Sequence, residues 1–402
     1  MCVVWFILVV MFTLILFVGI LALLVLVHEW GHFFVARKSG IKVYEFGFGF
    51  PPRAFGWYKD PKTGKFVFVN GKGKNTLKET VGGEDRESPD EFPATVYSLN
   101  WLPLGGFVKI KGENGELAQE SDSFGSKPFW KKGSVLIAGV TMNVFLAAVL
   151  LSAGFTIGLP ADKDVLSDPR AIVVEEPAVT AQQVENGSPA DSAGVKYGDI
   201  LLSISGTPLI TSSDLVTYVE AHPTEEAILE VKRGEDIVTL TLTPAQLSDE
   251  DATPRLGIIL ADAGIVRYPW YIAIWKGILA ALFGVVNIFL TFFFLIKGLV
   301  TGQGLAFSVA GPVGIAVVVG ESARLGMSYL INIVAMLSLS LAVINILPIP
   351  ALDGGRLFFV VYERLFKKPV PMKYEQTAHT IGFLLLMILI VVVTWRDITN
   401  LF

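Results

Sequence analysis

The sequence has little of what an ordinary soluble domain needs. Only 17% of its 402 residues are charged, and residues 1–27 contain no charge at all. This stretch has neither the basic start nor the small-residue cleavage site of a secretory signal peptide, so we expect a retained helix. Cysteine is almost absent as well. Because Cys2 is the only one, no intramolecular disulfide can form.

Long apolar runs are what the sequence has in abundance. Its mean hydropathy is +0.58 and indicates an integral membrane protein. Five runs are near or above the roughly 20 residues that span a bilayer; they cover 3–36, 134–158, 271–300, 330–349 and 380–395. A further run at 305–320 is short and is interrupted by glycine and proline.

The segments between these runs differ in charge. Residues 37–132 hold 16 Lys and Arg against 12 Asp and Glu, whereas residues 161–262 hold 6 against 19. Basic loops tend to remain in the cytoplasm. We therefore expect 37–132 to be cytoplasmic and 161–262 to lie outside the cytoplasm.

Both segments show the patterns of folded structure. The outer one has strand character at 171–179 and 227–233, a helix at 212–222, and a turn, short helix and strand over 187–209. In the inner one, KFVFVNGKGK (65–74) predicts a hairpin with Asn-Gly at its bend. The stretch 97–114 predicts two extended pieces around Pro103 and two glycines.

Two histidines and a glutamate interrupt the first apolar run. His28 and His32 are four residues apart, so on a helix they share one face and could bind one zinc ion. Glu29 could then act on a water molecule that the metal activates. Ionisable groups inside a membrane are costly and are functional by default. A chance occurrence with hydrogen-bonded polar groups is the alternative.

A catalytic zinc site needs a third protein ligand as well as a position for water. The candidate is Asp353, in NILPIPALDGGRL (345–357). Taken alone, a solvated Asp in a turn is the more common explanation for such a position. The residues by themselves therefore leave the third ligand open.

Several segments together resemble the site-2 proteases, a family of intramembrane zinc metalloproteases. HEWGH (28–32) matches H-E-x-x-H, and NILPIPALDGG (345–355) matches N-x-x-P-x-P-x-L-D-G. AGVTMN (138–143) resembles A-G-P-x-x-N, although Val140 replaces the proline. GFGFPPR, WLPLGGFVKIKGE and GPVGIA also fit. The resemblance covers nearly the whole chain and is strongest to the bacterial branch that includes the regulator of sigma-E protease.

The resemblance implies a role for each matched residue. His28, His32 and Asp353 are implied to bind Zn²⁺, and Glu29 is implied to be the catalytic acid and base. We expect an unwound substrate stretch to be held as an added strand and by nearby amides; the residues expected to bind substrate are Asn345, Asn143, Leu104, Gly105, Gly106 and Phe107.

The outer segment has a resemblance of its own. SPADSAGVKYGDILLSISG (188–206) is similar to the core of a PDZ domain, and RLGIIL (255–260) is similar to the carboxylate-binding strand of circularly permuted bacterial PDZ domains. Such a domain binds an extended peptide at a sheet edge. We expect the groove at Leu256, Gly257 and Ile258. A spacer with an empty groove remains the alternative.

The zinc ligands also restrict the membrane topology. His28, His32 and Asp353 each lie at the C-terminal end of an apolar run, so the two runs must cross in the same direction. Residues 263–329 must therefore make an even number of crossings. Either 271–300 is interfacial or re-entrant, or 305–320 crosses as well.

These inferences predict a polytopic α-helical membrane protein with a zinc site inside the helix bundle, an extracytoplasmic PDZ-like α/β domain and a cytoplasmic loop rich in β-hairpins. The expected parts up to the outer domain are a first transmembrane helix with HEWGH (1–38), a cytoplasmic loop with β-hairpins (39–132), a second transmembrane helix (133–160) and the PDZ-like domain (161–262). They are followed by an apolar interfacial or re-entrant region (263–329), a third core helix with the LDG motif (330–357), and a cytoplasmic loop with the last transmembrane helix (358–402).

The resemblance implies a protease of the bacterial inner (plasma) membrane that acts in regulated intramembrane proteolysis. Its expected substrates are single-span proteins, such as anti-sigma factors or remnant signal peptides, cut within or near their transmembrane segments. Further expected partners are the lipid bilayer and a peptide C-terminus at the PDZ-like domain; no nucleic acid is expected. Two other classes remain open, a non-enzymatic membrane PDZ scaffold and a zinc transporter.

Overall fold

The computed structural model describes residues 2–70, 92–113, 115, 117, 119–185, 187–246, 254–301, 310–368 and 370–399. The chain divides into two compact units. The first comprises Met1–Ala147, Leu282–Phe307 and Leu337–Val392. The second comprises Ala148–Ala281, Ser308–Met336 and Val393–Phe402.

The first unit begins with the long helix α1 (Cys2–Lys38). Its last turn carries Arg37 and Lys38, whose positive charges favour the negative end of the helix dipole. Gly40, at a φ of +71°, then takes the left-handed conformation that commonly ends a helix. The backbone N–H of Ser39 and that of Gly40 donate to carbonyls of the last turn of α1.

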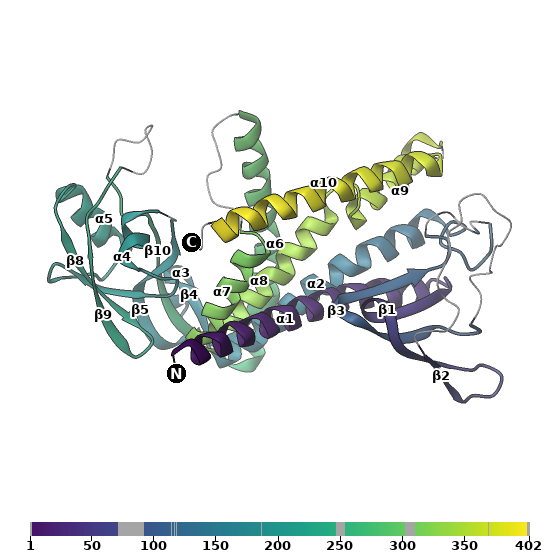
Figure 1. The fold of residues 1–402 in the computed structure, drawn as a ribbon, viewed down its shortest axis with the longest axis horizontal. Helices are drawn as coiled ribbons and strands as arrows, with labels where there is room; N and C mark the ends of the chain where they lie inside the picture. The colour runs from purple at the N-terminus through teal and green to yellow at the C-terminus, as the bar shows by residue number, and fades with distance from the viewer. Residues whose placement is uncertain are drawn as a thin grey trace. The chain divides into compact units, whose positions relative to one another are not determined.

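A three-stranded antiparallel sheet follows, with the order β2-β1-β3 (Figure 1). Its strands are β1 (Val43–Lys59), β2 (Phe66–Asn70) and β3 (Val96–Ile110). β3 packs against α1, and at Gly105 a Cβ atom would lie only 2.8 Å from Cγ1 of Val25. Glycine at this point, with a φ of +91°, lets β3 lie directly on the helix.

Parts of five further helices complete the first unit: α2 (Phe129–Ile157), α6 (Trp270–Thr301), α8 (Met327–Ile346), α9 (Asp353–Phe366) and α10 (Met372–Thr399). α2 runs antiparallel to α1, because Nδ1 of His32 contacts the Val135 carbonyl while His28 contacts Asn143. Gly31 allows this close packing, since a Cβ there would lie 2.4 Å from the Ala138 oxygen.

The second unit is built on a seven-stranded antiparallel sheet of order β4-β10-β5-β6-β8-β9, with β7 paired to β6. The strands are β4 (Leu159–Asp162), β5 (Ile172–Val184), β6 (Ile200–Ile204), β7 (Thr207–Pro208), β8 (Ala227–Arg233), β9 (Asp236–Leu242) and β10 (Ile258–Arg267). The short helices are α3 (Lys163–Leu166), α4 (Pro189–Ala193) and α5 (Ser212–Ala221).

The core of this sheet is apolar and fully enclosed. Val179, Ile204, Leu229 and Val231 have no exposed surface, and Leu215 of α5 packs against them. The same unit contains the helix α7 (Pro312–Leu325), whose first-turn N–H at Gly314 donates to the buried carboxylate of Asp397. The strands β5, β6 and β8 and the helices α4 and α5 lie where the sequence predicts them.

Five described helices are long and apolar enough to cross a membrane: Val10–Lys38, Phe129–Ile157, Trp270–Gly298, Met327–Ile346 and Met372–Thr399. They match the five apolar runs of the sequence. The helix α7 has 14 residues and is shorter than a span requires.

One local prediction differs from the structure. β3 continues as one strand through Pro103 and the following glycines and does not divide into two extended pieces. The reason is that β1 pairs with most of β3, and β-bulges absorb the shifts in register between the two strands. The described hairpin joins β1 and β2 around Asp60 and Gly64. The bend predicted at Asn70 and the following glycine extends outside the described residues.

Candidate metal centre

The centre starts from two histidines on one face of α1. The side chains of His28 and His32 are each 8% exposed, and their Nε2 atoms lie 3.2 Å apart. A separation of four residues places both rings on the same side of the helix, one turn apart. Both Nε2 atoms face a carboxylate from a distant part of the chain.

That carboxylate belongs to Asp353, the first residue of α9. Its Oδ2 lies 2.9 Å from Nε2 of His28 and 3.1 Å from Nε2 of His32. The two glycines after Asp353 make this placement possible. A Cβ at Gly354 would lie 2.1 Å from the Leu347 oxygen, so only glycine lets the start of α9 pack onto the end of α8.

The spacing of the three atoms fits a zinc ion. Zinc bonds to nitrogen and oxygen of about 2.0–2.1 Å in a tetrahedral site place neighbouring ligand atoms about 3.4 Å apart. The observed separations of 2.9 to 3.2 Å are slightly shorter than this. Two imidazoles and a carboxylate are also a donor set that zinc prefers. The residues present therefore fit the metal.

The other ring nitrogens are held by α2. Nδ1–H of His32 donates to the Val135 carbonyl at 2.8 Å. Nδ1 of His28 lies 3.2 Å from the amide nitrogen of Asn143, whose amide oxygen is buried without a partner among the described residues. Rotating the amide by 180° lets this oxygen accept a hydrogen bond from Nδ1–H. Both histidines then present an unprotonated Nε2 to the metal.

A glycine of α2 leaves room for the centre. A Cβ at Gly139 would lie 2.4 Å from Nε2 of His32 and 2.6 Å from Nε2 of His28. Any side chain there would occupy the space that the ligand atoms face. Sequence reasoning did not single out this residue, although it lies inside the AGVTMN segment.

Glu29 lies beside the histidines and faces the sheet. Its carboxylate accepts a hydrogen bond from the backbone N–H of Val108 in β3. β3 therefore passes directly beside Glu29, the residue that follows His28. A substrate bound alongside β3 would be within reach of this carboxylate.

The predicted substrate residues fall into two groups. Gly105, Gly106 and Phe107 lie in β3 beside α1, where Gly106 approaches Leu26. Leu104 belongs to the same strand, but its side chain lies outside the described part of the structure.

The two predicted asparagines lie on helices. Asn345 is partly buried in the last turn of α8. Asn143 is fully buried behind His28, and its backbone carbonyl accepts a hydrogen bond from Ser338. Its position is that of a group that orients His28.

The predicted peptide groove lies at the start of β10. Leu256 is buried, Gly257 has a φ of +74°, and Ile258 is the first strand residue. β5 pairs with this strand from residue 258, whereas β4 pairs with it only from residue 263. The second edge of residues 258–262 therefore has no partner strand in the described part of the chain. The nearby α5 is fixed by Ser212, whose N–H donates to Asp262.

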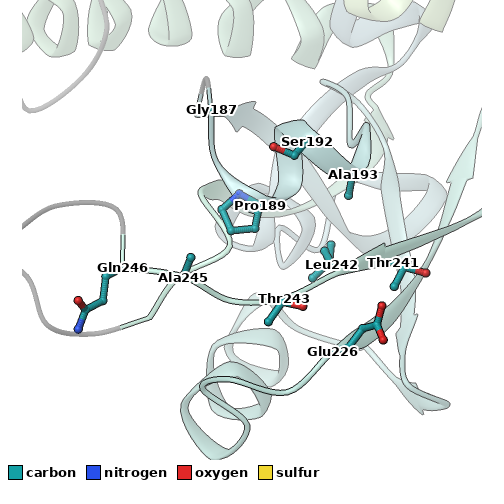
Figure 2. A pocket seen from close by; sticks show the side chains of 10 residues that line it. All are labelled: Gly187, Pro189, Ser192, Ala193, Glu226, Thr241, Leu242, Thr243, Ala245 and Gln246. Carbon is teal, nitrogen blue, oxygen red and sulfur yellow. The ribbon is translucent and has the colours of Figure 1, made fainter.

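Figure 2 shows a separate pocket of about 420 Å³ in the same domain. It lies between α4 and the end of β9, and it is lined by Gly187, Pro189, Ser192, Ala193, Glu226, Thr241, Leu242, Thr243, Ala245 and Gln246. None of the three predicted groove residues lines it. The pocket is therefore distinct from the predicted peptide groove.

Comparison with known proteins places these features in a family. The model of peptidase family M50 matches residues 16–69 and 90–389. Zinc metalloprotease RasP of Shouchella clausii is 30% identical over 97% of this chain and 99% of its own length. Regulator of sigma-W protease RasP of Bacillus subtilis is 31% identical, with the same coverage of 97% and 99%. A Clostridium perfringens protein whose name proposes a zinc metalloprotease is 34% identical over 93% of this chain and 95% of its own.

A comparison with solved structures finds similarity to a PDZ domain. The PDZ domain of the SdrC-like protein from Listeria monocytogenes is 21% identical and covers 23% of this chain and 95% of that domain, with a TM-score of 0.20.

Proposed function

Because this chain belongs to peptidase family M50 and is a multi-pass membrane zinc metalloprotease, we propose that His28, His32 and Asp353 hold its zinc and that Glu29 is its general base. One observation carries this proposal: the three ligand atoms, from α1 and the first residue of α9, meet at 2.9 to 3.2 Å, with Glu29 next to them. The enzyme acts in intramembrane proteolysis, and its substrates are peptide bonds within or near the transmembrane segments of single-span proteins.

The chain's own residues supply the proton transfers. Bound zinc supplies Lewis acidity and brings the pKa of a water molecule towards about 7. Glu29 takes the proton as the water attacks the peptide carbonyl, and it returns the proton to the leaving amine. Val108 N–H keeps the Glu29 carboxylate oriented between the strand and the ligands. Asn143 and the Val135 carbonyl hold the two imidazoles in place.

The substrate is held as an extended strand. A transmembrane helix hides its carbonyls in its own hydrogen bonds, so it must unwind before it is cut. β3 offers the backbone of Leu104, Gly105, Gly106 and Phe107 beside α1, close to Glu29. Addition of a strand to a sheet edge binds any sequence through main-chain hydrogen bonds. The side-chain amide of Asn345 forms a hydrogen bond with the backbone of the same unwound substrate stretch.

The sheet regions lie on opposite sides of the membrane. The basic segment 39–132 and the segment after Asp353 are cytoplasmic, and the acidic segment 161–262 is extracytoplasmic, in a bacterial inner membrane. The PDZ-like domain then stands away from the zinc, where its groove at Leu256, Gly257 and Ile258 accepts a peptide C-terminus. Substrates of this kind include anti-sigma factors and remnant signal peptides.

A Glu29→Gln variant tests the proposal. The full chain and the variant are each expressed with candidate single-span proteins, and cleavage and bound zinc are measured. We expect the variant to keep its zinc and to lose about 10² to 10⁴-fold in cleavage rate, the usual contribution of general acid–base catalysis. Cleavage at the wild-type rate would remove Glu29 from the reaction. If neither chain cuts any protein, two other results would be informative. Persistent binding of the candidate proteins would favour a scaffold, and persistent zinc transport would favour a transporter.

A further inference from the structure

The turn that delivers Asp353 to the histidines is held by the last helix. Nδ1 of His379 in α10 accepts a hydrogen bond of 2.8 Å from the backbone N–H of Ala351. The ring lies 5.8 Å from the ring of Phe359 in α9. Nε2 of His379 is buried and has no partner among the described residues. The hydrogen bond to Ala351 is therefore the one polar contact that orients this ring in the described structure.

Ala351 has a backbone conformation that needs such support. Its φ is +81°, in the left-handed region that residues other than glycine rarely adopt. Strained conformations of this kind persist only where the surrounding structure determines them. Ala351 is two residues before Asp353, so a change in its conformation would move the carboxylate.

Pro350, the residue before Ala351, also packs closely against α10. A Cβ at Gly382, three residues after His379 and on the same face of the helix, would lie 2.4 Å from the Pro350 oxygen. Helix and turn are thus in direct backbone contact. At the start of α9, Gly354 likewise allows close backbone contact with the end of α8.

We propose that His379 is a positioning residue for the zinc site, acting through Ala351 on Asp353. The imidazole accepts the hydrogen bond from Ala351 N–H and keeps Ala351, within the turn at 349–352, in its left-handed conformation. The Asp353 carboxylate is then already in place when zinc binds, so no ordering of the turn is needed. This inference rests on the proposed assignment of Asp353 as a ligand. Groups that orient ligands typically contribute 10 to 100-fold to metal affinity.

The test measures zinc affinity in the purified full-length chain in detergent, by competition with a chromogenic chelator. His379→Asn keeps an acceptor oxygen at the position of Nδ1, because both atoms are bonded to Cγ. His379→Gln places its oxygen one carbon further away. Asp353→Ala reports on the ligand itself. His222→Gln is the matched control, since His222 stacks on Tyr218 in the second unit.

We expect His379→Gln to bind zinc about 10 to 100-fold more weakly and His379→Asn to keep most of the affinity. The double variant His379→Gln with Ala351→Gly should regain part of the loss, because glycine takes a positive φ without help. Helix content by circular dichroism checks that each variant is folded.

Each other outcome has a distinct meaning. Wild-type affinity in His379→Gln, with loss in Asp353→Ala, overturns the positioning role and leaves the proposed zinc site intact. Equal losses in His379→Asn and His379→Gln also overturn it, since ring packing and not the acceptor would then matter. Wild-type affinity in Asp353→Ala removes the ligand assignment itself.

Discussion

At the scale of single residues, the metal centre depends on small groups as much as on its ligands. His28 and His32 can face one ion only because Gly139 of α2 leaves the space open. Asn143 and the Val135 carbonyl then set the tautomers of the rings. A second glycine of α2, Gly133, has ample room, since a Cβ there would lie 3.9 Å from Leu357, an ordinary contact distance. The two glycines therefore form a matched pair.

Gly139→Ala should abolish zinc binding or weaken it by more than about 100-fold, because the methyl group would overlap both Nε2 atoms. Gly133→Ala should bind zinc as the wild type does, and its helix should be slightly more stable because alanine is the better helix former. Zinc content after purification distinguishes the two. Full zinc in Gly139→Ala would show that the histidines do not converge as described.

The strained turn gives a second prediction at this scale. Ala351→Val should weaken zinc binding, because a β-branched residue at a φ of +81° costs about 1–3 kcal/mol. Ala351→Gly should be tolerated, since glycine adopts this φ freely. Chelator competition on both variants gives the comparison. If valine were accepted as readily as glycine, the left-handed conformation of Ala351 would not matter to the site.

At the scale of helices and strands, the proposed zinc ligands constrain the direction in which α1 and α8 cross the membrane. His28 and His32 lie in the last turns of α1, and Asp353 follows the end of α8 at Ile346. If both helices lead to one ion, as proposed, they must cross the membrane in the same direction. The segment between α2 and α8 must then cross an even number of times. Between the end of β10 and α8 the described residues form two helices, of which α6 is long enough to span and α7 is not, so we expect α6 to lie in the interface or to re-enter.

Cysteine labelling tests this topology, after Cys2 is replaced. A cysteine at Lys62, in the exposed turn between β1 and β2, should react with a membrane-impermeant reagent only from the cytoplasmic side. A cysteine at Glu220, on the exposed side of α5, should react only from outside. The physical reason is the charge asymmetry of the two segments. Labelling of both positions from one side would break the proposed arrangement.

At the scale of the whole molecule, we expect the PDZ-like domain to influence which substrates are admitted. On the proposed topology it lies on the side away from the zinc, so it cannot touch the bond that is cut. It could act as a receptor for a peptide C-terminus, or as a filter against substrates with a bulky outer part. A domain of about 90 residues has a radius of gyration near 13 Å, enough to obstruct an entrance between helices. We propose filtering as its main role.

Deletion of residues 171–260, with a flexible replacement, should let the enzyme cut a substrate whose outer domain is intact and which the full chain rejects. Steric exclusion would be lifted, while the zinc site and β3 would be unchanged. Cleavage is followed for the intact substrate and for a trimmed one. A receptor role predicts the opposite, with the intact substrate still uncut and the trimmed one cut more slowly.

The sequence by itself determined the class of protein and half of its proposed metal site. Apolar runs of bilayer length are typical of membrane-spanning helices, and five helices in the structure correspond to them. Two histidines four apart share a helix face in any sequence context. The family and the zinc metalloprotease activity, inferred from the HEWGH and LDGG segments, are confirmed by the comparisons. The strands and short helices of the PDZ-like domain also followed from local patterns.

The family resemblance implied Asp353 as the third ligand, but only the tertiary structure decided whether this and other distant groups meet those histidines. Asp353 is 321 residues from His32, and a carboxylate in a turn looks the same in sequence whether it is solvated or buried. The space at Gly139, the amide of Asn143 behind His28 and the contact of His379 with Ala351 are equally non-local. Local preferences specify helices and turns from neighbouring residues, whereas a metal site depends on how separate helices pack against one another.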